Sequence, residues 1–456
     1  MPRPAPETES DRAAALAGIG PPVDTAALAG IATACARERK AATAPAAEGP
    51  GSFSLAEIAR HLIPVAPGHL RRVLKANPGL PQGDGDAANA AGAGGGPRRF
   101  TLEEVQRMRA HLAAEGSPAK AYLPWRPAGL TARIVTVANC KGGSGKTTTV
   151  AHLAMAAALD GYRVLVIDLD GQGALTALFG GRVDGEGATV LPLLARHHAR
   201  HLQRDNRARA LRGETPQPLD ATLDAALNTP AASLVQRTAW PGIDLIGAGL
   251  ELCLAELRLP VWRQTARGWR PWEALGQGLA DDGLLADYDI VFIDTPPALG
   301  FLTLGALAAA QILLVPTGAT AEEFDATGRF FAMLHASFAA IEEEENRAAR
   351  ALGGTGIAFS WDAVRALITR YDATRQAAAA AAMQAAMGRT LLPQRQEFTP
   401  LIGAPGTAPR ALYAASARGA PREARLRARA SFDMTYAAFR QLLHGAWRRA
   451  ETAAGG

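Results

Sequence analysis

The residues best suited to chemistry lie in one glycine-rich segment, Lys141-Gly142-Gly143-Ser144-Gly145-Lys146-Thr147-Thr148. Glycines let successive backbone N–H groups turn toward phosphate oxygens without a clash from Cβ, and a following helix adds the positive end of its dipole. Lys146 would bridge the β- and γ-phosphates, and the Thr147 hydroxyl would ligate Mg²⁺. The segment therefore predicts a site that binds ATP with Mg²⁺ and hydrolyses it.

The start of this loop departs from the ordinary phosphate-loop pattern GxxxxGK[ST]. Cys140 stands where the first glycine is expected, five places before the last glycine of the loop, and Lys141 follows it. A second lysine adds positive charge where phosphates already attract Lys146. It could neutralise leaving-group charge on the nucleotide of a facing subunit, as a catalytic cation delivered in trans.

Two apolar segments end in acids that could complete the site. Val164–Asp170 carries Asp168 and Asp170, and the segment DIVFID ends at Asp294. Ligands of an open parallel sheet bind outside the carboxyl ends of its strands, so these acids belong at the edge that holds the phosphate loop. Asp294 fits a position just behind the Mg²⁺ ligands, and Asp170 or Asp168 fits the orientation of an attacking water. A lone acid here is as often a helix cap, but three beside a phosphate loop favour function.

The elements that must position these residues are short apolar runs alternating with helical stretches from Arg133 onward. The candidate strands are Ile134–Ala138, Val164–Ile167, Ile243–Ile246, Ile290–Ile293, Ile312–Val315 and Val364–Ile368. A helix from Thr147 to about Leu159 follows the loop. The pattern predicts an α/β domain, a doubly wound and mostly parallel sheet of the P-loop NTPase class. Region 181–240 yields no strand.

The residues before this sheet predict a small, mostly helical domain with a winged helix-turn-helix. Ser54 and Glu57 form a capping-box pattern, and Pro67 suits the first turn of a second helix. A third helix is expected from Thr101 to about Ala114. The basic residues expected to contact DNA are His69, Arg71, Arg72, Lys75, Arg98 and Arg99. Two short helices joined by a tight turn, the second basic, are typical of helix-turn-helix, and a generic helical hairpin is the alternative.

Composition divides the 456 residues into four parts. Residues 1–50 predict a disordered or weakly helical segment, 51–115 the helix-turn-helix domain, 116–132 a linker and 133–456 the ATPase domain. The run Gly83–Gly96 predicts a flexible tip. The net charge of +5 is mild for this length.

The cysteines and the N-terminus indicate the compartment. Cys35, Cys140 and Cys253 are scattered and odd in number, which argues against disulfides and a zinc site and fits a reducing cytoplasm. The N-terminus lacks the apolar core of a signal peptide. The uncharged stretch Ala298–Pro316 approaches the roughly 20 residues that a bilayer needs. We interpret it instead as a helix followed by a buried strand.

The loop, the VLVIDLDGQG segment and the DIVFIDTPP segment together resemble the deviant Walker A ATPases of the ParA/MinD group. The resemblance extends to RepA-type plasmid-partitioning ATPases with an N-terminal helix-turn-helix, through RRFTLEEV, Thr369-Arg370-Tyr371 and Ala411-Leu412-Tyr413. It covers roughly residues 53–115 and 133–445. The chain departs from the family at Gly171, at Pro316–Thr320 and at Ala414, which bears on the partner interface and the subgroup.

The resemblance implies an ATP-dependent homodimer in which Lys141 reaches the nucleotide of the other subunit. Such a dimer binds DNA, often nonspecifically, and a centromere-binding partner of the ParB type stimulates hydrolysis. The N-terminal domain, where present, binds an operator and represses the partition genes. The resemblance thus implies plasmid or chromosome partitioning by a cytoplasmic, nucleoid-associated protein.

Two segments near the C-terminus, one basic and one apolar, can each be interpreted in two ways. An arginine run, Arg410, Arg418, Arg422, Arg425, Arg427 and Arg429, either binds DNA phosphates or forms a solvated helical face. The last helix, Met434–Trp447, either packs on the sheet, which we favour, or lies on a membrane as in MinD. An ATP-switched transcriptional regulator is a further alternative. An electron-donating or metal-pump relative ranks last, because the cysteine pattern that it needs is missing.

Overall fold

The structure, a computed structural model, describes residues 47–83, 98–115, 122–183, 188–266, 268–402, 411–414 and 421–455. The predicted N-terminal segment lies almost wholly outside these ranges, as do Arg410, Arg418, residues 116–121 of the predicted linker and most of the predicted Gly83–Gly96 tip. Residues 47–456 belong to one compact unit.

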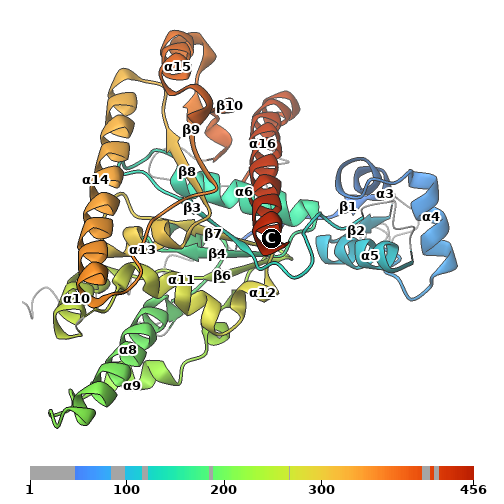
Figure 1. Cartoon of the computed structure of the whole chain (residues 1–456). Helices are drawn as coiled ribbons and strands as arrows, with labels where there is room; N and C mark the ends of the chain where they lie inside the picture. Colours follow the sequence, from blue (N-terminus) through green and yellow to red (C-terminus); the bar gives the residue numbers. More distant parts are fainter. Residues whose placement is uncertain are drawn as a thin grey trace, which may run out of the picture. The chain divides into compact units, whose positions relative to one another are not determined.

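The core of this unit is an eight-stranded sheet with strand order β10-β9-β8-β3-β7-β4-β6-β5 (Figure 1). All neighbouring strands are parallel except β5 and β6. The strands are β3 (Arg133–Val137), β4 (Val164–Asp168), β5 (Gln236–Arg237), β6 (Ile243–Ile246), β7 (Ile290–Asp294), β8 (Ile312–Thr317), β9 (Ala363–Tyr371) and β10 (Leu391–Glu397). The predicted doubly wound sheet and its six strands are confirmed, and β5 and β10 are additional.

Alternate residues of the central strands enter two different hydrophobic clusters. On β4, Val164 and Val166 join the cluster that contains α6 (Lys146–Asp160), whereas Leu165 and Ile167 join the cluster on the other face. This alternation follows from the two-residue period of a strand. Because both faces are covered, the strands are apolar throughout, as is typical of parallel sheets.

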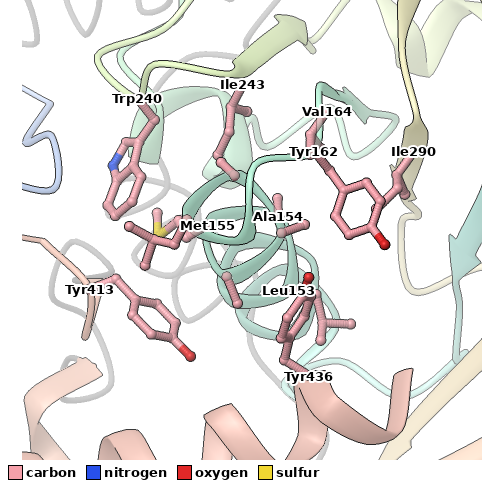
Figure 2. Packing of buried hydrophobic residues seen from close by; sticks show 14 of the residues in the cluster. Leu153, Ala154, Met155, Tyr162, Val164, Trp240, Ile243, Ile290, Tyr413 and Tyr436 are labelled. Atoms are coloured by element: carbon pink, nitrogen blue, oxygen red, sulfur yellow. The ribbon is translucent and has the colours of Figure 1, made fainter. Parts of the chain in front are cut away.

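Helices of the two layers are contributed by distant parts of the chain. The cluster around α6 includes α16 (Arg422–Gly455) and the segment 411–414, and Figure 2 shows Tyr413, Tyr436 and Trp240 around the side chains of α6. The opposite cluster takes residues from α8 (Leu191–Leu211), α9 (Ala221–Leu227), α10 (Leu252–Thr265), α11 (Pro271–Asp281), α12 (Leu284–Asp287) and α13 (Phe301–Ala309). The remaining α-helices of the sheet domain, within the described ranges, are α7 (Ala174–Leu178), α14 (Ala321–Leu352) and α15 (Ala373–Met387).

Both segments that raised a membrane interpretation are packed in the protein. Ala298–Pro316 forms α13 and most of β8, as interpreted from the sequence. On α16, Phe439, Leu443 and Trp447 are fully buried, and the Phe439 ring lies 5.3 Å from that of Phe292, centroid to centroid. None of the helices within the described ranges is long and apolar enough to cross a bilayer.

The N-terminal region consists of short helices, two of which begin with a capping box, and of one pair of short strands. They are β1 (Phe53–Ser54), α3 (Leu55–Glu57), a π-helical turn (Ile58–Leu62), α4 (Pro67–Ala76), β2 (Arg99–Phe100) and α5 (Leu102–Glu115). The predicted capping box of Ser54 and Glu57 is present, and Thr101 and Glu104 form a second one at the start of α5. β1 and β2 pair antiparallel.

A buried arginine joins this region to the sheet domain. The guanidinium of Arg109, 2% exposed, donates to the carbonyls of Leu62, Leu159 and Asp160. The last two carbonyls belong to the final turn of α6, where a cation is favoured by the helix dipole. Gly161 follows with φ of 104°, and a Cβ there would overlap the guanidinium. Arg109 therefore caps the helix whose other end carries the phosphate loop.

Candidate functional site

The phosphate loop connects the end of β3 to the start of α6, as predicted. Gly143 and Gly145 have φ of 71° and 91°, a left-handed conformation that favours glycine. Gly145 is the N-cap of α6, so the free amides of the first turn of the helix open toward the loop. The Thr369 hydroxyl donates to the Ser144 carbonyl at 2.7 Å and fixes the loop against β9. The loop is thus preformed for an anion.

A pocket of about 310 Å³ opens above this loop. Of the predicted nucleotide-binding residues, Gly142 through Thr148 line it, and so does Asp170. Asp168 and Lys141 are not among its lining residues.

The two predicted lysines have different surroundings. Lys146 is 7% exposed, and its Nζ lies 3.4 Å from the Lys141 carbonyl oxygen. Burial lowers the pKa of Lys146, against the opposing influence of Asp294 and Asp170. The Lys141 backbone amide donates to Asn139 Oδ1, and its ammonium lies 2.8 Å from Glu322 at the start of α14. The charge of Lys141 is therefore held outside the pocket of its own chain.

The predicted acids occupy two kinds of position. Asp168 and Asp294 are neighbours in the β4–β7 register and are fully buried. Burial raises the pKa of Asp168 to about 6, and the neighbouring Asp170 carboxylate adds to this shift. Burial also raises the pKa of Asp294 well above its usual range, with a further contribution from repulsion by the Asp168 carboxylate. Asp168 accepts hydrogen bonds from the Thr176 amide and hydroxyl and from the Asp170 amide, so its carboxylate is engaged in holding the loop after β4. Of the two residues predicted to orient water, Asp170 is the one at the pocket.

Asp294 meets the side chain that was predicted to bind Mg²⁺. Thr147 Oγ1 donates to Asp294 Oδ2 at 2.6 Å. Asp294 Oδ1 is buried and finds no hydrogen-bond partner among the described groups, and the same is true of Ser144 Oγ. A divalent cation beside Thr147 would offset the negative charge of the two buried carboxylates. The hydrated cation and its phosphates would supply partners for Asp294 Oδ1 and Ser144 Oγ. The residues therefore fit a Mg²⁺–nucleoside triphosphate complex.

Part of the pocket comes from residues that the sequence pattern did not single out for the site. They are Pro297, Thr369, Arg370, Gln396, Glu397, Phe398, Thr399, Ile402 and Phe432. Arg370 has φ of 51°, the one non-glycine residue with positive φ in the described chain, and pairs with Glu323. Strained backbone beside a pocket is a signal of function that is visible only in three dimensions.

The predicted DNA-contacting residues fall into two groups. In the N-terminal region Arg71, Arg72, Lys75 and Arg98 are exposed and His69 is half-buried, whereas Arg99 turns inward to Ser52. Arg71, Lys75 and Arg98 line one groove of about 760 Å³.

The C-terminal arginines on α16 make contacts within the chain. Arg427 lies 3.6 Å from Glu397, and Arg429 lies over the Tyr413 ring and 3.5 Å from Asp433. Arg425 is half-buried, and the side chain of Arg422 lies outside the described atoms. Two arginines of this run, Arg427 and Arg429, thus have partners within the chain.

Comparison with known proteins places this site in a family. Residues 132–346 match the model of a family described as an AAA domain. Two relatives are named putative replication protein A. The one from Sinorhizobium fredii is 29% identical over 404 residues, 87% of each chain. The one from Rhizobium rhizogenes is 31% identical over 317 residues, 69% of this chain and 67% of the relative.

A shorter match and a solved structure agree with these relatives. The chromosome-partitioning ATPase Soj of Thermus thermophilus is 35% identical over 187 residues, 41% of this chain and 55% of that protein. The structure of a partition protein aligns with a TM-score of 0.57 at 19% identity, covering 95% of this chain and 100% of that chain, which shows the same fold. The phosphate loop with its extra lysine, the sheet order and these matches show that the chain belongs to the ParA/MinD family of P-loop partitioning ATPases.

Proposed function

We propose that this chain is an ATP-switched partition protein. It binds Mg²⁺-ATP in the pocket above the phosphate loop, dimerises in that state and binds DNA. It hydrolyses ATP in response to a ParB-type centromere-binding partner, and so moves a plasmid or chromosome over the nucleoid in the cytoplasm. The observation that carries this proposal is the position of Lys141, which belongs to the loop but lies outside its own pocket.

The two lysines divide the work on the phosphates. Lys146, buried beside Asp294 and Asp170, binds the phosphates of its own chain. Lys141, tied to Glu322 at the exposed rim, is free to leave this surface ion pair, since water screens exposed pairs and they contribute little. Its reach then extends to the nucleotide of a facing copy, where it offsets charge on the leaving phosphate.

The remaining groups of the site take supporting roles. Thr147 and Asp294 would hold the Mg²⁺, which neutralises charge on the phosphate oxygens. Asp170, half-buried at the pocket wall, orients the attacking water. Asp168 holds the loop that carries Asp170.

DNA binding is assigned to the N-terminal region. We take residues 51–115 as a winged helix-turn-helix domain, 116–132 as a linker and 133–456 as the ATPase domain. The groove lined by Arg71, Lys75 and Arg98 offers cations to DNA phosphates. Through this domain the protein binds its own operator and represses the partition genes.

The test is DNA binding by the full-length protein with ATP, with ADP and without nucleotide. We expect tighter binding with ATP, because dimerisation doubles the number of basic surfaces on one DNA. Lys141→Ala should bind nucleotide normally and lose the ATP effect. Equal affinity in all three states would contradict the proposal.

A second candidate function is an ATP-switched transcriptional regulator, favoured by the exposed basic residues of α4. Steady-state ATPase rates with and without DNA and a ParB-type partner separate the two. A partition protein is stimulated by these ligands, whereas a regulator in which ATP only switches operator binding keeps its basal rate.

A further inference from the structure

Helix α10 carries a row of exposed apolar side chains. Leu250 just before the helix, then Leu254, Leu257 and Val261, are 67%, 43%, 70% and 54% exposed. The steps of four, three and four residues place all of them on one face. Four of the eleven large exposed hydrophobic residues in the described chain thus lie in this one row, which we call the α10 row.

The opposite face of α10 is already used by the core. Leu252, Ala255, Leu259 and Trp262 are buried in the cluster on that side of the sheet. A helix that is apolar on both faces is typical of one that is covered on both sides. The exposed apolar surface of the α10 row is on the order of a few hundred Å², the size at which a patch marks an interaction site.

The α10 row begins at the edge of the sheet that holds the nucleotide pocket. Glu256 accepts hydrogen bonds from the amides of Phe301 and Leu302 at 2.8 and 3.0 Å, which fixes α10 to the segment that follows β7. A Cβ on Gly171 would lie 3.0 Å from Cys253 Sγ, so the start of α10 runs beside the loop after β4. Both segments follow carboxyl ends of strands, and Asp170 and Pro297 from them line the pocket.

We propose that the α10 row is part of the interface with a second copy of this chain, packing against the same row of that copy. This inference rests on the proposed ATP-dependent dimer and adds the surface that holds it. A copy that faces the pocket closely enough to receive Lys141 also faces the start of α10. A two-fold axis that passes beside α10 brings this helix against the same helix of the second copy, and spacing of four and three residues is the pattern by which two helices interdigitate.

The size of the row accounts for dependence on nucleotide. A stable interface buries about 800 Å² per partner, more than this row alone supplies. The row therefore adds to contacts made through the bound nucleotide and Lys141, and does not hold a dimer without them.

The test compares the full-length protein with Leu254→Ser/Leu257→Ser by sedimentation velocity, with Mg²⁺ and a slowly hydrolysed ATP analogue. Leu211→Ser is the matched control, because Leu211 is 91% exposed at the end of α8. We expect the double variant to bind the analogue as the wild type does but to dimerise at least about tenfold more weakly. The control should dimerise normally.

A second measurement uses the rate of thiol labelling to test whether the row becomes buried in the dimer. Leu257→Cys should react with a maleimide more slowly with the ATP analogue than with ADP, read at that position by mass spectrometry, whereas Leu211→Cys should react equally in both. An unchanged dimer in the double variant, or unchanged reactivity at position 257 in a dimer, overturns this inference and leaves the ATP dimer standing. A wild type that stays monomeric with the analogue overturns both the dimer and this inference.

Discussion

Lys141 and Lys146 belong to one loop but differ in burial, partner and charge environment. The buried Lys146 has its pKa lowered by desolvation, and two carboxylates hold its charge in place. Lys141 lies at the rim with an exposed glutamate as partner. The first is suited to binding phosphate within the chain, and the second to a contact that forms only when another surface arrives.

These surroundings predict different losses for the two lysines. Lys146→Ala should abolish nucleotide binding in a fluorescent-nucleotide titration. Lys141→Ala should bind nucleotide with nearly unchanged affinity, and its stimulated phosphate release should fall about 1,000-fold or more, as for other cations supplied in trans. Turnover at the wild-type rate in Lys141→Ala would refute the trans assignment.

The site could be predicted from the sequence as far as local pattern reaches. The phosphate loop, Thr147 and the strand-end acids follow from contiguous residues and from the rule that strand ends meet at one edge. The pattern could not separate Asp168 from Asp170, because the difference lies in the Thr176 contacts that occupy Asp168. Thr369 and Arg370 were noted only as part of the family resemblance, and the pattern did not place them at the site, since their position beside the loop depends on the distant strand β9.

At the scale of elements, His152 joins α6 to the segment 411–414. Its Nδ1 lies 2.7 Å from the Thr148 carbonyl oxygen, and its Nε2 accepts from the Leu412 amide at 3.1 Å. These two bonds fix the neutral ring with its proton on Nδ1. Burial lowers the pKa of His152 to about 4. A second proton on this ring would face the Leu412 N–H.

This burial predicts loss of stability in acid. Below about pH 6.5 the unfolded chain binds a proton at this ring that the folded chain excludes until about pH 4, so the stabilisation is present above 6.5 and falls with pH. Between pH 7 and 5 the wild type should lose about 2 kcal/mol more of its free energy of unfolding than His152→Gln, in urea titrations. Equal losses in the two proteins would show that His152 is not the group responsible.

The junction of Arg109 with α6 makes a second prediction at this scale. Gly161→Ala should destabilise the protein by at least about 2 kcal/mol, through left-handed strain and through overlap with the guanidinium. Gly283→Ala is the control, because Gly283 has φ of 70° and open space around it, so it reports the strain alone. Hydrogen exchange in α5 should rise only in the Gly161 variant. If both variants behave alike, overlap with Arg109 contributes nothing.

At the scale of the whole molecule, the basic groove predicts how DNA binding depends on salt. Replacing the groove residues Arg71, Lys75 and Arg98 by Ala in the full-length protein should weaken binding and reduce the slope of log K against log salt by about three per bound subunit. Arg347→Ala, an exposed arginine on α14, should leave the slope unchanged. Fluorescence anisotropy at several salt concentrations measures both. An unchanged slope in the triple variant would place the DNA contacts elsewhere.

The fold as a whole was predictable because its central strands are apolar on both faces. The edges were not. β10 reads LLPQRQE, with a proline and polar residues, and pairs only with β9, so its strand character comes from the neighbour rather than from its own pattern. The Arg- and Ala-rich region 181–240 folds mainly into the helices α8 and α9, with β5 as a two-residue strand.

Because Arg109 fixes the N-terminal region to the end of α6, the distance from this region to the bound nucleotide can be followed by energy transfer. The helix has 15 residues and is about 22 Å long, with the phosphate loop at one end and the N-terminal region at the other. The distance between a donor dye on α4 and an acceptor on the nucleotide is therefore set by α6 as long as Arg109 keeps its contacts with the end of that helix. The efficiency of energy transfer between them reports whether the region with the basic groove stays attached to α6 when ATP binds and when it is hydrolysed.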